Sequence, residues 1–312
     1  MQLKRAAAQL HLSLMAASCA LLSGTARSQT TSGEDVTEPL QLDTELLYYK
    51  ENAGRVQVIE PMVSLKKDFG DLRTLDGTLT IDTMSGATPN GAIPAKTPQT
   101  FASPSSTSLT PTPGGKTTLY TIAPGDLPQD PHFKEQRVAA DLEWSQPTGL
   151  NDSLAVGGHV SSEHDFDSVA AHGGVSHDFN SKNTTLTADV NLEYDRIHAH
   201  GGNPVPGSDY ELYEKEPSQT KHVAGALIGL TQTMTRGWLS ALNYTVDRSQ
   251  GYLTDPYRIL SVLDAEGNVT GYLYESRPDT RTRQSLYWVN KVALGTEVLD
   301  LSYGPWPTCR AR

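Results

Sequence analysis

Residues Thr184–Asp195 alternate between apolar and polar side chains, and this pattern constrains the fold more than any other stretch of the sequence. The apolar set is Leu186, Ala188, Val190, Leu192 and Tyr194, and the polar set is Thr187, Asp189, Asn191, Glu193 and Asp195. A period of two over about ten residues is typical of a β-strand with one buried face. The length also suits a tilted strand that crosses a bilayer. A lipid-facing strand and a strand of a soluble sandwich share this pattern, so the rest of the chain has to separate them.

Composition excludes several classes of protein. The 312 residues carry a formal net charge of -11, which argues against a nucleic-acid partner, because such a partner needs a basic face. No run of about 18 apolar residues follows the N-terminal segment, so no transmembrane helix is predicted. Cys19 and Cys309 lie at opposite ends of the chain, a pattern unlike that of a disulfide framework or a zinc site.

The N-terminus has the pattern of a secretory signal peptide over residues 1–28. Lys4 and Arg5 form a basic start, a mostly small and apolar stretch follows to Leu22, and small residues near Ser28 suit cleavage. One alternative is a short amphipathic helix. Another is a lipoprotein site at Cys19, which the sequence disfavours. A polar lead over residues 29–43 and a β-barrel domain over residues 44–303 are predicted to follow.

The lengths of the connections between predicted strands sort into two groups. Three segments are long: 85–131, which is rich in Pro, Thr and Ser, then 201–220, then 250–280. The first has a composition that is not expected to build a core, as in an interdomain linker or a surface loop. We favour a surface loop, because the strand pattern resumes unchanged beyond it. Counted from Glu45, these segments follow the third, seventh and ninth strands, so they all fall at one end of the sheet. Transmembrane barrels have this asymmetry, with short periplasmic turns and longer extracellular loops.

Four ordered motifs resemble an uncharacterised bacterial family. They are Val58–Asp68 (VIEPMVSLKKD), Ser85–Ala92 (SGATPNGA), Gly251–Arg258 (GYLTDPYR) and Arg277–Gln284 (RPDTRTRQ). With these motifs the chain resembles domain of unknown function thirty-five seventy from about residue 43 to Tyr303. The resemblance implies an outer-membrane barrel, and it brings no activity and no catalytic residue.

Polar residues within strands, together with an arginine-rich segment, form a candidate cluster in the lumen or at the rim. Its members are Asp141, Glu143, Asp189, Glu193, Arg277, Asp279, Arg281 and Arg283. A basic cluster at a barrel mouth can bind an anionic substrate or a lipopolysaccharide phosphate. The interpretation that we favour is a ladder of ion pairs inside the lumen.

Histidines and acidic residues also gather in the middle of the sequence: His159, His164, His172, His177, Asp165, Asp167 and Asp178. A metal site needs ligands that converge at fixed distances, so we interpret these residues as polar side chains of the lumen or of loop tips. We find no nucleophile elbow, no glycine-rich phosphate loop and no CxxC motif. The sequence therefore nominates no catalytic residue, no metal and no cofactor.

We predict an all-β fold: an antiparallel, up-and-down transmembrane β-barrel in the bacterial outer membrane. The expected partners are outer-membrane lipid and, by class, the barrel-assembly machinery. The expected role is non-enzymatic, as a pore, surface or structural protein, although the enzyme question stays open. One alternative is a barrel enzyme that acts on lipid or glycan at the outer rim, and another is a soluble secreted β-sandwich that binds a ligand.

The C-terminal part predicts that this barrel is incomplete. About eleven strands are counted by Tyr303, whereas single-chain bacterial barrels have an even number. An aberrant tail over residues 304–312 follows, in which Pro305 and Pro307 end the strand pattern. Because lipid does not tolerate unpaired strand edges, we expect such a chain to insert poorly or to aggregate.

Overall fold

The structure is a computed structural model that describes residues 40–52, 55–103, 119–199, 202–210, 216–294 and 297–303. The predicted signal peptide (1–28), most of the polar lead (29–43) and the tail (304–312) lie outside these residues. Within them, no helix is long and apolar enough to cross a membrane.

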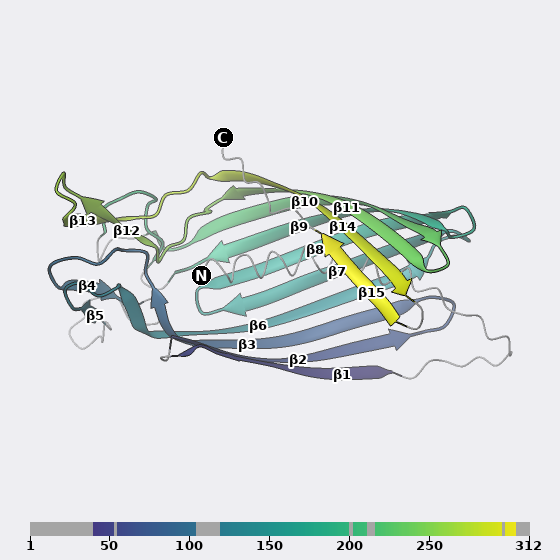
Figure 1. The fold of residues 1–312 in the computed structure, drawn as a ribbon, viewed down its shortest axis with the longest axis horizontal. Coiled ribbons are helices and arrows are strands. Elements are labelled where there is room, and N and C mark those ends of the chain that lie inside the picture. The colour runs from purple at the N-terminus through teal and green to yellow at the C-terminus, as the bar shows by residue number, and fades with distance from the viewer. Residues whose placement is uncertain are drawn as a thin grey trace.

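One antiparallel sheet of 11 strands dominates the fold, and its strands follow one another in space as they do along the chain (Figure 1). Its strands are β1 (Gln41–Lys50), β2 (Val56–Asp68), β3 (Thr74–Pro89), β6 (Gln129–Pro147), β7 (Asp152–Glu163), β8 (Phe166–Phe179), β9 (Thr184–Ile197), β10 (Gln219–Thr235), β11 (Trp238–Gly251), β14 (Thr280–Leu294) and β15 (Glu297–Tyr303). The prediction of an all-β, antiparallel, up-and-down fold is confirmed. The strand number matches the count made from the sequence.

The sheet is curled, and in the view of Figure 1 strands β14 and β15 pass in front of β7 and β8. Over the described residues, β1 pairs only with β2 and β15 only with β14. The part of the sheet that the structure describes therefore has two edges.

The alternating strands give the sheet one apolar and one polar face, as the sequence predicted. On β9, Val190 and Leu192 are 61% and 66% exposed, whereas Asp195 on the other face is 0% exposed. On β6, the apolar Val138 and Leu142 are likewise exposed. We call the face that carries Val190 the outer face and the face that carries Asp195 the inner face. The inner face is the more shielded one because the sheet curls around it.

Short turns join the strands at one end of the sheet. Between β8 and β9, Asn180, Ser181 and Lys182 all adopt positive φ values of 51°, 56° and 67°. This left-handed conformation turns the chain within a few residues, and asparagine is among the residues that tolerate it best. The predicted difference between the two ends is confirmed, since the long connections follow β3, β9 and β11, at the opposite end.

The long connections form a folded cap at that end. We use "cap" for the described residues of these connections: 90–103, 119–128, 202–210 and 252–279. Two hairpins lie within it, β4 (Gln99–Ala102) with β5 (Leu119–Ile122), and β12 (Ile259–Leu263) with β13 (Val269–Tyr274) (Figure 1).

The cap has its own hydrophobic core, which the sequence analysis did not expect of the 85–131 segment. Phe101 is 0% exposed and packs with Tyr120 and Ile259, and Tyr210 and Tyr272 pack against this cluster. The expectation that this segment builds no core is wrong for its described part. The aromatic residues are few in that segment, but the other long connections supply the rest of the cluster.

Hydrogen bonds join the three connections within the cap. The Ile259 N–H donates to the Asn90 carbonyl oxygen at 2.9 Å, and the Ala102 N–H donates to the Tyr210 hydroxyl at 3.0 Å. The Tyr210 N–H donates in turn to the Tyr272 carbonyl oxygen at 2.8 Å. Segments far apart in the sequence are therefore joined into one unit at this end of the sheet.

Candidate functional site

The inner face of β6 to β9 carries a chain of histidine–carboxylate pairs. The Nδ1 atom of His159 lies 2.6 Å from an Asp141 carboxylate oxygen. His172 lies between two carboxylates, with Nε2 3.5 Å from Glu143 and Nδ1 3.6 Å from Asp189. Three of the predicted cluster residues, Asp141, Glu143 and Asp189, thus contact histidines that the sequence pattern did not link to them.

A second cluster lies nearer the cap, on β9 and β10. The Lys221 ammonium lies 3.3 Å from the Glu193 carboxylate and also forms an ion pair with Asp195, which is fully buried. A buried carboxylate is tolerated when a cation compensates its charge. Glu193 is thus the fourth residue of the predicted polar cluster that lies on the inner face.

Glycines on the inner face make room for these polar side chains. A Cβ atom at Gly157 would meet His172 Nε2 at 2.2 Å and the Leu142 carbonyl oxygen at 2.9 Å. A Cβ atom at Gly225 would meet the side-chain oxygens of Asn191 and Asp247 at 2.1 and 2.3 Å. The polar side chains therefore lie flat against the neighbouring strand.

The predicted arginine cluster is divided between the sheet and the cap. Arg281 and Arg283 lie on the inner face of β14, where Arg283 pairs in register with Asp247. Arg277 lies in the cap, with its Nε 2.8 Å from Glu275. Asp279 has an exposed side chain, and its carbonyl oxygen accepts a hydrogen bond from Gly251. The four residues do not form one basic cluster.

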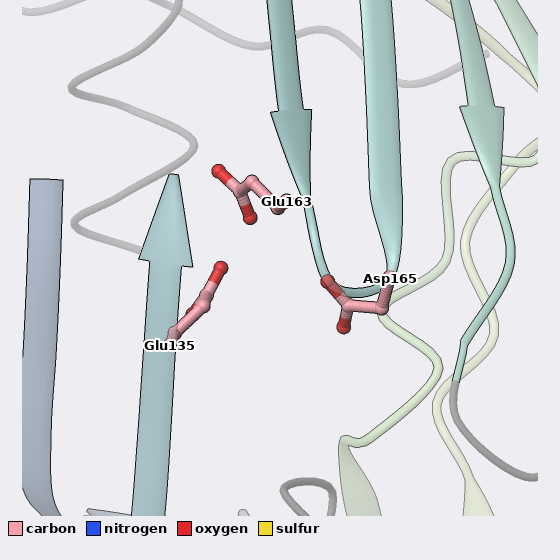
Figure 2. A group of neighbouring side chains, drawn as sticks. All are labelled: Glu135, Glu163 and Asp165. Carbon is pink, nitrogen blue, oxygen red and sulfur yellow. The ribbon is translucent and has the colours of Figure 1, made fainter. Parts of the chain in front are cut away.

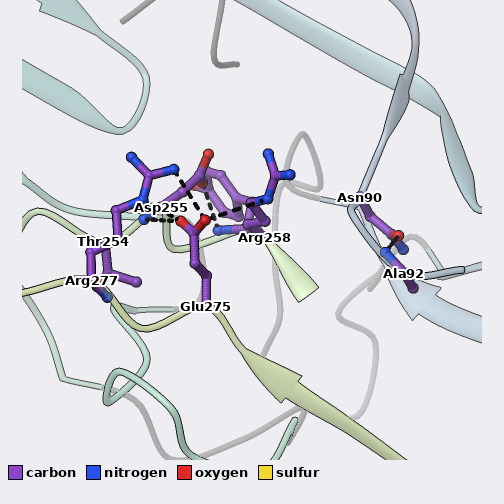
Figure 3. A network of polar contacts seen from close by, with 8 residues as sticks. Asn90, Ala92, Thr254, Asp255, Arg258, Glu275 and Arg277 are labelled. Carbon is purple, nitrogen blue, oxygen red and sulfur yellow. Dashed lines mark hydrogen bonds and ion pairs between the residues drawn. The ribbon is translucent and has the colours of Figure 1, made fainter. Parts of the chain in front are cut away.

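Glu275 links the parts of the cap that meet the sheet (Figure 3). Its carboxylate pairs with Arg277 and also lies 3.4 Å from Arg258 Nε. Thr254, which is 1% exposed, accepts a hydrogen bond from the Arg277 N–H at 3.2 Å. The network joins residues 254–258 to residues 275–277 within the cap.

Burial shifts the pKa of two cap tyrosines. Burial raises the pKa of Tyr120 well above its ordinary value, although a hydrogen bond from Asn90 opposes the shift. Burial also raises the pKa of Tyr210. In the turn between β12 and β13, hydrogen bonds from Asn268 lower the pKa of Asp264. The cap therefore favours neutral phenols and an ionised turn aspartate.

Three carboxylates meet beside the β7–β8 turn, one of them from the cap-side half of β6 (Figure 2). Glu135, Glu163 and Asp165 each place an oxygen within 4.8 Å of the others. Such oxygens are ligands of the kind that calcium prefers, but an acidic group alone does not define a cation site. Of these three residues, the sequence pattern indicates only Asp165, which lies near the histidines; the two glutamates were not predicted. Only the β6–β7 register, which pairs Arg137 with Glu163, indicates this group.

The apolar part of the outer face forms a continuous band that is oblique to the strands. On the cap side, the first polar outer residue either keeps its pairing level from one strand to the next or moves two residues away from the cap. These residues are Lys50, Gln57, Thr83, Gln136, Ser162, Asp167, Arg196, His222, Arg248 and Gln284, from β1 to β14. The border drifts in one direction by roughly one residue per strand. With about 3.3 Å per residue and about 4.8 Å between strands, this drift corresponds to a strand tilt of about 35–40°.

The width of the band can be measured along β9. On β9 it extends from Leu186 to Tyr194, and polar residues Thr184 and Arg196 border it on both sides. At about 3.3 Å per residue and the tilt derived above, the band is about 20–30 Å tall. Transmembrane barrels have an apolar band of about 25 Å and strands tilted by about 35–45°.

Comparisons with known proteins identify a family for the sequence and a distant likeness for the structure. A family described as "Protein of unknown function (DUF3570)" matches residues 11–304. No curated protein matches the chain. Among solved structures, the outer membrane transporter YddB from Escherichia coli aligns with a TM-score of 0.33 and 10% identity. The alignment covers 80% of this chain and 33% of that chain, so this chain spans about a third of that protein.

Proposed function

Because the chain belongs to the family described as protein of unknown function DUF3570, which brings no activity with it, we propose a function from the two faces of its sheet. We propose that it is an integral outer-membrane β-barrel protein with a non-enzymatic role, whose inner wall lines a water-filled passage that prefers cations.

The observation that carries the membrane part is the oblique apolar band on the outer face. A soluble β-sandwich buries its apolar face against a second sheet. Here Val190, Leu192 and Leu142 are more than half exposed, and the band has the height and tilt of a membrane span. A bilayer explains a band of constant height across tilted strands, because every strand has to change from apolar to polar side chains at the same depth.

The observation that supports a cation preference is the charge of the inner face. Carboxylates outnumber lysine and arginine along its described middle and cap-side part. The carboxylates include Asp82, Glu135, Glu163, Asp141, Glu143, Asp189, Glu193, Asp195 and Asp247, and the cations include Arg137, Lys221, Arg281 and Arg283. Rings of acidic side chains favour cations in channels.

The proposal requires the two sheet edges to be paired in the membrane, because hydrocarbon offers no hydrogen-bond partner to a free edge. Cell fractionation tests this requirement. A heat-modifiable, protease-resistant species in the outer-membrane fraction would support the barrel and would contradict the expectation that the chain inserts poorly. Recovery of the folded chain as a soluble periplasmic protein without detergent would refute the membrane proposal.

Planar-bilayer recording tests the passage. We expect reversal potentials that favour cations, and a weaker preference in Asp247→Asn on the inner face. Asp167→Asn is the matched control, because Asp167 lies on the outer face at the border of the band. No conductance from inserted full-length protein, or equal effects of both variants, would contradict a cation-preferring passage.

A further inference from the structure

A shallow groove crosses the outer face where the apolar band meets the cap side. Its volume is about 490 Å³, and it extends over β8, β9, β10 and β11. Two rows of paired residues form its floor. One row is Ala171, Leu192, Ala224 and Arg248, and the next is Val169, Tyr194, His222 and Gln250. Small alanines beside the larger Leu192 create the depression, and polar side chains close it on the β10–β11 side.

Leaving aside the edge strand β1, where Lys50 lies at the border, the border of the band carries basic or imidazole side chains only beside this groove. The first polar outer residues are Arg196, His222 and Arg248 on the consecutive strands β9, β10 and β11. On β6, β7 and β14 the corresponding residues are uncharged: Gln136, Ser162 and Gln284. In a chain with a net charge of -11, this local positive charge is a distinct feature.

The charge of Arg248 is available to a ligand. Its cross-strand neighbours are Ala224 and Thr282, and within the described residues no carboxylate forms an ion pair with it. Arg196 differs, because Asp167 lies directly opposite it in the β8–β9 register. The His222 ring lies 5.2 Å from the Tyr194 ring and faces the same groove.

From this arrangement we propose that the groove binds a lipid that carries a phosphate monoester. An acyl chain lies along Val169, Ala171 and Leu192, and the phosphate meets Arg248 and His222 at the border of the band. Guanidinium groups bind phosphate through paired, charge-assisted hydrogen bonds. Placing the phosphate at the border keeps it at headgroup depth while the chain stays in hydrocarbon. The inference rests on the proposed membrane location of the outer face.

Binding to the purified full-length protein in an uncharged detergent tests the site. The probes are dimyristoyl phosphatidic acid, dimyristoylglycerol, which has the same chains without phosphate, and inorganic phosphate, which has no chains. We expect phosphatidic acid to bind at least about tenfold more tightly than either of the other two, since hydrogen bonds to charged groups contribute on this scale.

Two variants and one control localise the binding. Arg248→Gln removes the phosphate contact, and Ala224→Leu fills the groove while keeping the charge. Both should weaken phosphatidic acid binding, by about tenfold for Arg248→Gln. Arg236→Gln should leave it unchanged, because Arg236 is an exposed arginine in the turn at the far end of the β10–β11 hairpin.

Several outcomes would overturn the site. Equal losses in Arg236→Gln and Arg248→Gln would indicate nonspecific charge attraction. Equal affinity for dimyristoylglycerol would show that the phosphate does not contribute to binding. Inorganic phosphate that binds as tightly as the lipid would show that the acyl chains do not contribute. Flotation with phosphatidylcholine vesicles separates this proposal from the proposed function. Flotation without selective lipid binding refutes the groove alone, whereas selective binding without flotation refutes the membrane location.

Discussion

Replacing Val190 with arginine separates a lipid-facing from a water-facing outer face. Val190 lies at the middle of the apolar band on β9, and its cross-strand neighbours are Gly173 and Ala226. These small neighbours leave room for a long side chain, so crowding contributes little to the effect. In lipid, an arginine near the bilayer midplane costs about 2–4 kcal/mol. In water, a substitution at an exposed position of this kind usually changes stability by no more than about 0.5 kcal/mol.

The magnitude can be measured as a change in the free energy of unfolding. We would fold the full-length protein into phosphatidylcholine vesicles and unfold it with guanidinium chloride, following tryptophan fluorescence. A loss of about 2–4 kcal/mol lowers the ratio of folded to unfolded protein by roughly 30-fold to 1,000-fold. The midpoint should shift while the slope stays the same, because the area exposed on unfolding does not change.

Thr220→Arg is the matched control. Thr220 is also an exposed outer residue, but on β10 it lies beyond His222, outside the apolar band. We expect it to cost less than about 1 kcal/mol, since the penalty falls towards the interface. If Val190→Arg and Thr220→Arg had the same small effect, the outer face would be in water, and the reasoning from the oblique band would fail.

Three further predictions concern the cap and the orientation of the sheet. Phe101→Ala should lower the stability of the cap by about 3–5 kcal/mol, because the side chain is fully buried, and hydrogen exchange should show the loss in the cap but not in the sheet. Burial raises the pKa values of Tyr120 and Tyr210, so the cap is stabilised below the ordinary tyrosine pKa of about 10, and this stabilisation is lost as pH rises beyond it. Hydrogen exchange of the cap at pH 8 and pH 11 should show this loss of stability, and Tyr120→Phe should make the loss smaller. If the loss between pH 8 and pH 11 were the same in Tyr120→Phe, the buried Tyr120 phenol would not be its cause. In a background without native cysteines, Leu263→Cys in the cap should react with an impermeant maleimide on intact cells, whereas Leu150→Cys in a short turn should react only after permeabilisation; the reverse pattern would invert the orientation.

The pattern of side chains by itself determined the strands of the large sheet, their facing and the sorting of the loops, but not the β4–β5 hairpin of the cap. The alternation from Leu186 to Tyr194 reports which side chains share a face, because successive residues of a strand point to opposite sides. It also placed Asp189 and Glu193 together on the polar face. The positions of the three long connections after odd-numbered strands sufficed to put them at one end. All of these properties are local or depend only on counting along the chain.

The tertiary structure alone decided which residues meet across strands. Sequence alternation is the same for every register that keeps the faces, so it does not show that His172 lies between Glu143 and Asp189, or that Glu135 meets Glu163. It also does not show the drift of the apolar border, which appears only when the pairing of ten strands is known. The core around Phe101 escaped prediction for the same reason, because its members come from separate connections that carry too few apolar residues individually. Pairing between strands that are distant in the sequence sets these contacts, and a local pattern of side chains does not specify that pairing.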